Sequence, residues 1–270
     1  MRRLTFLVTP AIAAAGQEQL VAAGFLRHAV EVGSWQDQGH SALICWVRDA
    51  RERALVGATM GQPDRDGAAL VVADALDHWR QAIAPGCWVL GRLVAVPRAA
   101  RHVIRLPVGS GFGLGDHPTT RCAAVLLMRT PVARRRVLDL GCGTGVLAAL
   151  AGQCGAQVLD AVDLDPDAVK HTRRTLAANA VQGRVWTSDL LKRVPDVYDV
   201  VLANLISDLL IELFATRTLP ARVARGGTVV CSGIRDDLRL AVERAARADG
   251  WRVTARTWQG EWVGLALNRA

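Results

Sequence analysis

Long hydrophobic runs, paired cysteines and lysine are all scarce in this sequence of 270 residues. Every apolar stretch meets a charged residue before the roughly 18 residues that a membrane helix needs, so no transmembrane span is predicted. The six cysteines form no Cys-x-x-Cys pair and the six histidines lack metal-ligand spacing, which predicts no metal site and favours a reducing cytoplasm. A hydrophobic share of 51% nevertheless predicts a packed core and one or two domains.

The basic residues are almost all arginine, because only Lys170 and Lys192 among the 33 are lysines. The formal net charge is +8, and the excess follows residue 100, where 23 basic residues stand against 16 acidic ones. Such a charge suggests nucleic acid, with Arg134-Arg135-Arg136 as its densest run. That run precedes a predicted buried strand and is typical of a solvated turn, and the arginine content also fits coding bias. Direct RNA binding therefore stays an open alternative.

The first 107 residues predict a small α+β module and a connecting segment. The expected elements are strands at 4–8, 29–32, 42–47, 87–96 and 102–106 and helices at 11–23 and 68–83. Residues 1–66 are expected to form a substrate-recognition domain, and 67–107 a linker in which Pro85-Gly86 ends the second helix. The charged start at Met1-Arg2-Arg3 and the small residues that follow would also suit an export signal.

From residue 132 strands alternate with helices, which predicts a parallel sheet covered on both faces. The strands are expected at 136–140, 158–162, 184–187, 199–203 and 228–232. Two final strands, 252–257 and 262–267, are joined by a short turn at Gln259-Gly260 and predict a hairpin at the sheet edge. A plain dinucleotide-binding domain does not end in this way.

A glycine-rich turn follows the first of these strands in VLDLGCGTGVLAAL, residues 137–150. Glycine at 141, 143 and 145 permits a sharp bend and lets a ligand touch the backbone, although a simple strand-to-helix turn is the alternative. The third glycine comes one position earlier than in the G-x-G-x-x-G of dinucleotide enzymes. Asp139 would repel a pyrophosphate and attract an ammonium group. Asp163 is placed to accept hydrogen bonds from both hydroxyls of a ribose, and Asp165 is expected to cap the next helix.

The strand, the GxGxG turn, the acid and the terminal hairpin together resemble the S-adenosylmethionine-dependent methyltransferases of the Rossmann-like class. Two segments, VGSGFGLGDHPTTRCAAVLLM at 108–128 and VLANLISDLL at 201–210, resemble the PrmA type, which modifies large-subunit ribosomal protein eleven. The likeness covers about residues 85–270, with departures at Gly111 and Leu114, where the family has alanine and threonine. It implies an α/β fold: a Rossmann-like seven-stranded methyltransferase sheet over 108–270, with a C-terminal antiparallel hairpin and a small α+β domain before it.

The resemblance also implies which residues bind S-adenosylmethionine. They are Thr119, Thr120, Asp139, Gly141, Gly143, Gly145, Asp163, Asp189 and Asn204. Thr120, with Thr119, would bind the methionine carboxylate or amine, Asp139 its ammonium, Asp163 the ribose and Asp189 the adenine. Asn204 would be catalytic, with its side-chain oxygen close to the sulfonium and the incoming amine. The open alternatives are that the threonines start a helix, that Ser188-Asp189 cap a turn and that the asparagine satisfies strand-end backbone groups.

His117 is a candidate general base because its ordinary pKa is near 6.5, and its alternative is a hydrogen-bonded structural group at a helix start. The target is expected to be a lysine or α-amino group of a ribosomal protein. Enzymes that methylate base amines typically carry an Asp/Asn-Pro-Pro-aromatic segment, whereas Leu205-Ile206-Ser207 follows Asn204 here. The alternatives are a small-metabolite or other protein methyltransferase, a nicotinamide-dependent oxidoreductase and a non-catalytic RNA-binding protein.

Overall fold

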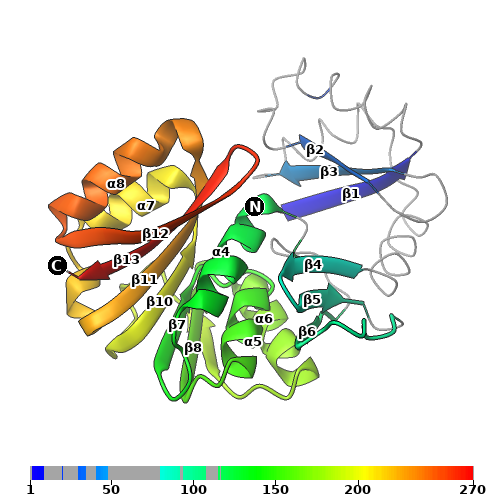
Figure 1. The fold of residues 1–270 in the computed structure, drawn as a ribbon, viewed down its shortest axis with the longest axis horizontal. Coiled ribbons are helices and arrows are strands. Elements are labelled where there is room, and N and C mark those ends of the chain that lie inside the picture. Colours follow the sequence, from blue (N-terminus) through cyan, green and yellow to red (C-terminus); the bar gives the residue numbers. More distant parts are fainter. Residues whose placement is uncertain are drawn as a thin grey trace. The chain divides into compact units, whose positions relative to one another are not determined.

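The computed structural model describes residues 2–8, 20, 30–34, 41–47, 80–91, 94–107, 115 and 117–269. The chain forms two compact units (Figure 1). One unit comprises Met1–Trp79 with Val108–Phe112, and the other comprises Arg80–Pro107 with Gly113–Ala270. The predicted boundaries at residues 66 and 107 stay a prediction, although the contacts group Arg80–Pro107 with the second unit.

The first unit contains an antiparallel sheet of three strands. They are β1 (Arg2–Val8), β2 (Val30–Ser34) and β3 (Ser41–Val47), with β3 in the centre. Each overlaps a strand predicted from the sequence, so the β-rich part of the expected module is confirmed. The predicted helix at 11–23 lies outside the described residues except for Leu20, which is helical and buried.

The second unit begins with a small sheet of β4 (Arg80–Ala84), β5 (Cys87–Leu90) and β6 (His102–Arg105). The predicted helix at 68–83 is wrong at its end, because residues 80–83 are in a strand, while residues 68–79 lie outside the described part. Pro85-Gly86 forms the turn of an antiparallel hairpin, with Gly86 at φ 73°. Proline followed by a glycine with positive φ is a turn signal as well as a helix stop.

Side-chain amides attach β6 to the helices that follow it. The Asn179 amide accepts from the Arg105 N–H and donates to the Arg105 carbonyl, both at 2.7 Å. Gln153 does the same for Val103, at 3.2 and 2.7 Å. These two amides therefore satisfy β6 backbone groups as a neighbouring strand would.

The large sheet has seven strands in the order β12-β13-β11-β10-β7-β8-β9. They are β7 (Arg136–Leu140), β8 (Val158–Asp163), β9 (Arg184–Thr187), β10 (Tyr198–Asn204), β11 (Val223–Arg235), β12 (Trp251–Gln259) and β13 (Trp262–Arg269). Five strands are parallel, and β13 runs antiparallel between β11 and β12. The predicted fold is confirmed, and β11 extends beyond the predicted 228–232 at both ends.

Helices cover both faces of this sheet, as Figure 1 shows, with α7 and α8 on one face and α4, α5 and α6 on the other. They are α4 (Pro118–Arg129), α5 (Val146–Gln153), α6 (Pro166–Ala178), α7 (Ser207–Ala215) and α8 (Arg239–Ala248), with the short 3-10 helices η2 (Leu219–Ala221) and η3 (Asp236–Leu238). Leu138, Val201 and Phe214 are among the buried residues of the core. In the described part of the chain no helix is long and apolar enough to cross a membrane.

The parallel strands give the large sheet two chemically different edges. The carboxyl edge is where β7, β8 and β10 end, at Leu140, Asp163 and Asn204. The amino edge is where the parallel strands begin, and β12 and β13 have their paired ends there, at Trp251 and Arg269. Ligands of open α/β sheets bind outside the carboxyl ends of the strands, which directs attention to the first edge.

Candidate active site

The glycine turn lies at the carboxyl edge, between β7 and α5. Gly141, Gly143 and Gly145 all have positive φ, at 75°, 54° and 80°. The N–H groups of Gly141 and Cys142 both donate to the Val162 carbonyl, at 2.8 and 3.0 Å, which ties the turn to the end of β8. Residues with a Cβ rarely adopt this conformation, so the sequence prediction of a sharp turn is confirmed.

Close packing within the protein is a second reason why two of these positions require glycine. A Cβ on Gly141 would lie 2.4 Å from Leu205 Cδ2, and one on Gly145 would lie 2.9 Å from Thr172 Cα. The turn is thus packed against the segment after β10 and against α6. This contact holds the turn in place beside the other groups of the carboxyl edge.

Asp163 ends β8 and binds the glycine turn directly. Its Oδ2 accepts from the Gly143 N–H at 2.9 Å, and its Oδ1 accepts from the Asp165 N–H at 3.0 Å. Each carboxylate oxygen can accept a second hydrogen bond, so both retain capacity for a ligand. Asp165 is the N-cap of α6, accepting from the Asp167 N–H at 2.8 Å, with Pro166 in the first helical turn, as predicted.

Asp139 is a buried carboxyl group next to this turn, with 2% of its surface exposed. Its Oδ2 accepts from the Ala148 N–H of α5 at 3.0 Å. Burial raises the pKa of Asp139 to about 7; the Ala148 hydrogen bond opposes the increase and the nearby Asp163 adds to it. A positive ligand near this carboxyl would favour its ionised form and lower that pKa.

Two buried side-chain oxygens at the carboxyl edge lack a hydrogen-bond partner among the described residues. They are Thr120 Oγ1, on α4, and Asn204 Oδ1, at the end of β10. Leaving such an atom unpaired costs about 1–3 kcal/mol. Buried polar atoms in folded proteins are nearly always paired, so these two indicate where a bound group would complete the site. Among the described residues, Asn204 Oδ1 therefore accepts no strand-end backbone N–H group.

The backbone directly after Asn204 is held tightly against β11. The Leu205 N–H donates to the Ser232 carbonyl at 3.0 Å, and a Cβ on Gly233 would lie 2.0 Å from the Leu205 carbonyl oxygen. Gly233, with φ 89°, therefore helps to fix the position of Asn204. Sequence reasoning missed this residue, whose signal is a glycine inside an otherwise β-rich strand.

His117 caps α4 and does not stand free in the site. Its Nδ1 accepts from the Thr119 N–H at 3.2 Å and lies 2.7 Å from Thr119 Oγ1. Its ring meets that of Trp262 edge-on, with centroids 4.9 Å apart. The Ser232 hydroxyl donates to the Thr119 carbonyl at 2.8 Å, which links α4 to β11. These contacts support the structural alternative for His117 and engage the Thr119 hydroxyl within the protein.

The turn after β9 places Asp189 on the same edge but toward solvent. Ser188 is buried; its N–H donates to the Asp163 carbonyl at 2.9 Å, and its Oγ accepts from the Arg193 N–H at 3.0 Å. Asp189 Oδ2 lies 2.6 Å from Lys192 Nζ, and the Asp189 side chain is 47% exposed. Ser188 therefore organises this turn, and the adenine contact of Asp189 stays a prediction. No cluster of three or more potential metal ligands occurs among the described residues.

Comparison with known proteins identifies the family. The family model described as ribosomal protein L11 methyltransferase (PrmA) matches residues 78–270. The chain belongs to this family. The ribosomal protein L11 methyltransferase of Thermotoga neapolitana is 35% identical to this member over 176 residues, which cover 65% of this chain and 66% of the relative. That of Geobacter metallireducens is 36% identical over 195 residues, or 69% and 63% of the two chains.

A solved structure supports the same assignment for this PrmA family member. The crystal structure of ribosomal protein L11 methylase from Lactobacillus delbrueckii subsp. bulgaricus matches with a TM-score of 0.66 and 25% identity, covering 70% of this chain and 98% of that one. The chain spans about two thirds or less of the length of the curated relatives, 66% and 63% in the two described above. The resemblance inferred from the sequence is thus confirmed at the level of the family.

Proposed function

We propose that this chain is an S-adenosylmethionine-dependent N-methyltransferase that acts on lysine or α-amino groups of a ribosomal protein. The observation that carries the proposal is the pair of buried, unpartnered oxygens on Thr120 and Asn204 at the carboxyl edge, in a member of the PrmA family. We place its activity in the cytoplasm, which is supported by the free thiols of Cys87, Cys122, Cys142, Cys154 and Cys231.

The described residues fit S-adenosylmethionine, a nucleoside that supplies a methyl group on a positively charged sulfur. The unpartnered Thr120 hydroxyl is assigned to the methionine carboxylate or amine. Asp139 is assigned to the ammonium group, directly or through water, because a buried carboxyl next to the turn favours a positive partner. The two oxygens of Asp163, each with a lone pair to spare, are assigned to the ribose hydroxyls.

The backbone of the glycine turn is assigned to the methionine part of the cofactor. Gly141 and Gly143 would bring peptide groups close to it, and Gly145 starts α5 at the N-cap. Asp189 is assigned to the adenine, since its turn is hydrogen-bonded to the end of β8 through Ser188. Thr119 contributes by holding the start of α4, because its hydroxyl is engaged by His117.

Methyl transfer needs a neutral amine aligned with the methyl group. Deprotonating a lysine amine at neutral pH costs about 4–5 kcal/mol from an ordinary pKa near 10.4, and an α-amine near 8 costs far less. Asn204 Oδ1 is assigned to accept a hydrogen bond from the incoming amine, which orients its lone pair. Alignment and exclusion of water contribute on the order of 7 kcal/mol or more. His117 is occupied as a helix cap, so no general base is assigned here.

A protein amine is preferred over a nucleobase because the segment after β10 has no Pro-Pro-aromatic sequence on which a base would stack. Ile206 is instead exposed directly after Leu205, at the start of α7. The relatives are named for ribosomal protein L11, which makes that protein the first substrate to test. The first unit is proposed to recognise the protein substrate.

The proposal is tested by incubating the purified chain with methyl-labelled S-adenosylmethionine and unmethylated ribosomal protein L11. Mass spectrometry should find added methyl groups at lysine or the amino terminus. Asn204→Ala should lower kcat by roughly 10²–10³-fold with little change in cofactor affinity, as expected for loss of one catalytic polar contact. Val200→Ala, in the same strand but in the core, is the matched control and should mainly lower stability.

Two outcomes would contradict this assignment. If the cofactor binds but no amine of the ribosomal protein gains a methyl group, the proposed substrate is wrong. If label instead enters a small molecule or another protein in a ribosome-free extract, the alternative methyltransferase activity is correct.

A further inference from the structure

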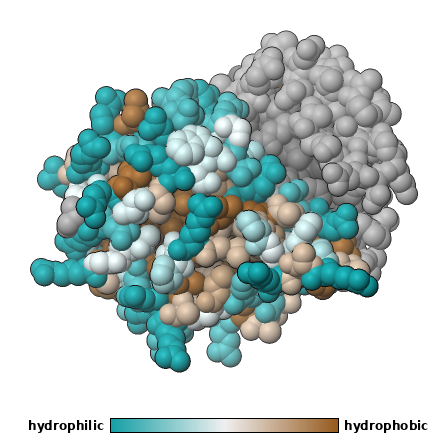
Figure 2. Space-filling view, in the orientation of Figure 1, coloured by the Kyte–Doolittle hydropathy of each residue, from teal (hydrophilic) through white to brown (hydrophobic). Residues whose placement is uncertain are grey.

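Arginine gathers at the amino edge of the large sheet, opposite the glycine turn. We call this surface the basic edge; it consists of Arg134, Arg135, Arg136, Arg184, Arg217, Arg222, Arg225, Arg252 and Arg269. Arg136 and Arg184 are the first residues of β7 and β9. Figure 2 shows long hydrophilic side chains projecting at the lower left of the second unit, where Figure 1 places the amino ends of β7 and β10.

Contacts show that these arginines lie close together. Arg222 lies beside the start of β10, because its carbonyl accepts from the Tyr198 N–H at 2.9 Å. Asp196 lies near Arg184, Arg136 and Arg222. These arginines lower the Asp196 pKa, and the hydrogen bond from Arg184 is the largest cause. At the other end of the edge, burial raises the pKa of Asp249, and the nearby charges of Arg217 and Arg269 oppose that increase. The basic edge therefore extends across the width of the sheet.

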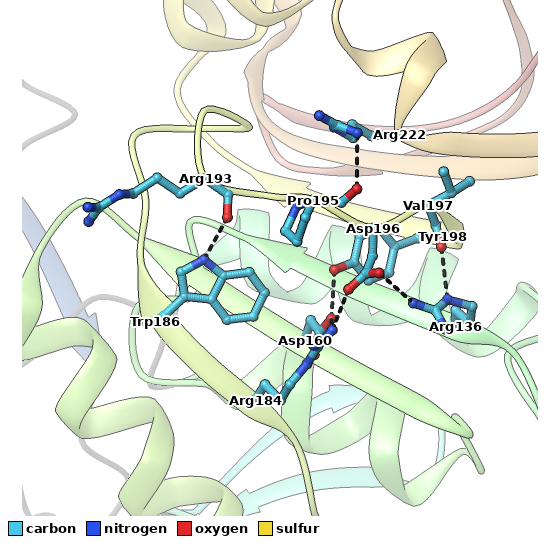
Figure 3. Close-up of polar contacts among 10 residues, drawn as sticks. All are labelled: Arg136, Asp160, Arg184, Trp186, Arg193, Pro195, Asp196, Val197, Tyr198 and Arg222. Carbon is cyan, nitrogen blue, oxygen red and sulfur yellow. Dashed lines mark hydrogen bonds and ion pairs between the residues drawn. The ribbon is translucent and has the colours of Figure 1, made fainter.

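Neutral acceptors orient several of these arginines, although Arg136 and Arg184 also pair with carboxylates. Figure 3 shows Arg136 Nε donating to the Val197 carbonyl at 2.9 Å and Arg222 donating to the Pro195 carbonyl at 3.1 Å. The Arg184 guanidinium lies 5.7 Å from the centre of the Trp186 ring. Guanidinium groups held in this way are preorganised for a bidentate acceptor such as phosphate.

Acidic residues at this edge balance only part of the charge. The four described there are Asp160, Asp196, Asp199 and Asp249. Asp160 and Asp196 pair with Arg184, Asp196 also lies 3.5 Å from Arg136, and Asp199 pairs with Arg135 at 3.6 Å. Arg134, Arg225 and Arg252 are exposed and have no side-chain hydrogen bond or ion pair within the described part of the chain. A net positive, solvent-facing surface remains.

We propose that the basic edge binds the phosphate backbone of RNA, an activity separate from the proposed methyl transfer. Arginine contacts to phosphates supply the sequence-independent part of nucleic-acid binding, and this edge carries nine arginines against four aspartates. A membrane surface is disfavoured because peripheral helices and loops that bind lipid insert apolar side chains. Val197 is the one large hydrophobic residue exposed at this edge in the described ranges.

The test measures binding of a fluorescent 20-nucleotide single-stranded RNA by anisotropy across a salt series. The variant Arg134→Gln, Arg225→Gln, Arg252→Gln removes three exposed charges from the basic edge. The control Arg98→Gln, Arg174→Gln, Arg244→Gln removes three exposed charges elsewhere. We expect the edge variant to lose at least tenfold in affinity at low salt and its log K against log salt slope to flatten by about two, at roughly 0.7 per phosphate contact. The control should stay within twofold of the wild type.

Three results would overturn the proposal. The first is that the wild-type chain does not bind RNA even at low salt, and the second is that the control variant loses as much affinity as the edge variant. The third is that the edge variant loses binding to phosphatidylserine vesicles and keeps its RNA affinity. Methylation of the ribosomal protein should be unchanged in the edge variant. The anisotropy measurement does not depend on methyl transfer, so it still tests RNA binding if the methyl-transfer proposal fails.

Discussion

One strand, β8, carries an aspartate to each edge of the large sheet, and the two carboxylates differ in their surroundings. At the amino-edge side, Asp160 is fully buried and accepts from the Tyr198 hydroxyl at 2.6 Å and from Arg184 at 2.8 and 2.5 Å (Figure 3). At the carboxyl edge, Asp163 accepts two backbone N–H groups and is partly exposed.

The comparison separates structural from functional polar groups. Side chains satisfy the carboxylate of Asp160 from two directions, so it needs no ligand. The carboxyl edge instead contains the unpartnered oxygens of Thr120 and Asn204 and the raised pKa of Asp139. Incomplete hydrogen bonding in an otherwise well-packed region is the physical sign of a binding site.

The largest effect is expected from Asp160→Ala. It leaves the buried Tyr198 hydroxyl without its acceptor and removes the partner of Arg184, whose side chain is 60% exposed and can regain water. We expect the free energy of unfolding to fall by about 3 kcal/mol with cofactor affinity unchanged. Urea denaturation and calorimetry measure the two quantities. Asp196→Ala, which removes a more exposed partner of the same arginine, should cost much less than Asp160→Ala, because water screens exposed ion pairs.

A change in cofactor affinity with Asp160→Ala would contradict the separation of the two edges. So would an unfolding free energy equal to that of the wild type.

A glycine at each edge gives the next comparison. Gly141→Ala places a Cβ 2.4 Å from Leu205 Cδ2 at φ 75°, whereas Gly226→Ala at φ 73° meets nothing within 4 Å. We expect about 2–3 kcal/mol of destabilisation for the first and about 1–2 kcal/mol, the backbone strain alone, for the second. Adding Leu205→Ala should remove the steric part in a double-mutant cycle. Equal costs for the two glycines, or no coupling in the cycle, would rule out the packing described here.

The smallest effect is the pH dependence that Asp139 contributes. Its pKa rises from 3.8 to about 7 on folding, so the folded state binds more protons than the unfolded state between these values. The free energy of unfolding should therefore fall as pH rises through this window, by about 1 kcal/mol between pH 6 and pH 7. Asp139→Asn keeps an acceptor for Ala148 and should lose this slope. Urea denaturation at pH 6 and pH 7 tests it, and an unchanged slope in the variant would contradict the account.

Local patterns in the sequence were sufficient to predict most of the large sheet. Alternation of apolar strands with capped helices predicted β7, β8, β9 and β10 closely, and the turn at Gln259-Gly260 predicted the terminal hairpin. The helix at 68–83 was wrong over β4, because Pro85-Gly86 fits both a helix stop and a hairpin turn. Pairing with β5 decides between them, and that contact is not local.

The candidate site was predictable where the chemistry follows from position on a strand. Asp163 and Asn204 stand at strand ends, so their place at one edge of the sheet could be inferred. The cap formed by His117 with Thr119 and the fit of Gly233 against Leu205 depend on elements that are distant in sequence or on exact backbone angles. No periodic pattern in the sequence predicts these two contacts.

Calorimetric titration with S-adenosylhomocysteine tests the central claim that the carboxyl edge binds this nucleoside through Asp163. The intact chain should bind it, and Asp163→Ala should lower the affinity by about 100-fold, since two hydrogen bonds to a charged acceptor are lost. Asp165→Ala, which removes only the cap of α6 from the same turn, should change the affinity by less than about threefold. Failure of the intact chain to bind, or equal affinity in Asp163→Ala, would contradict the account.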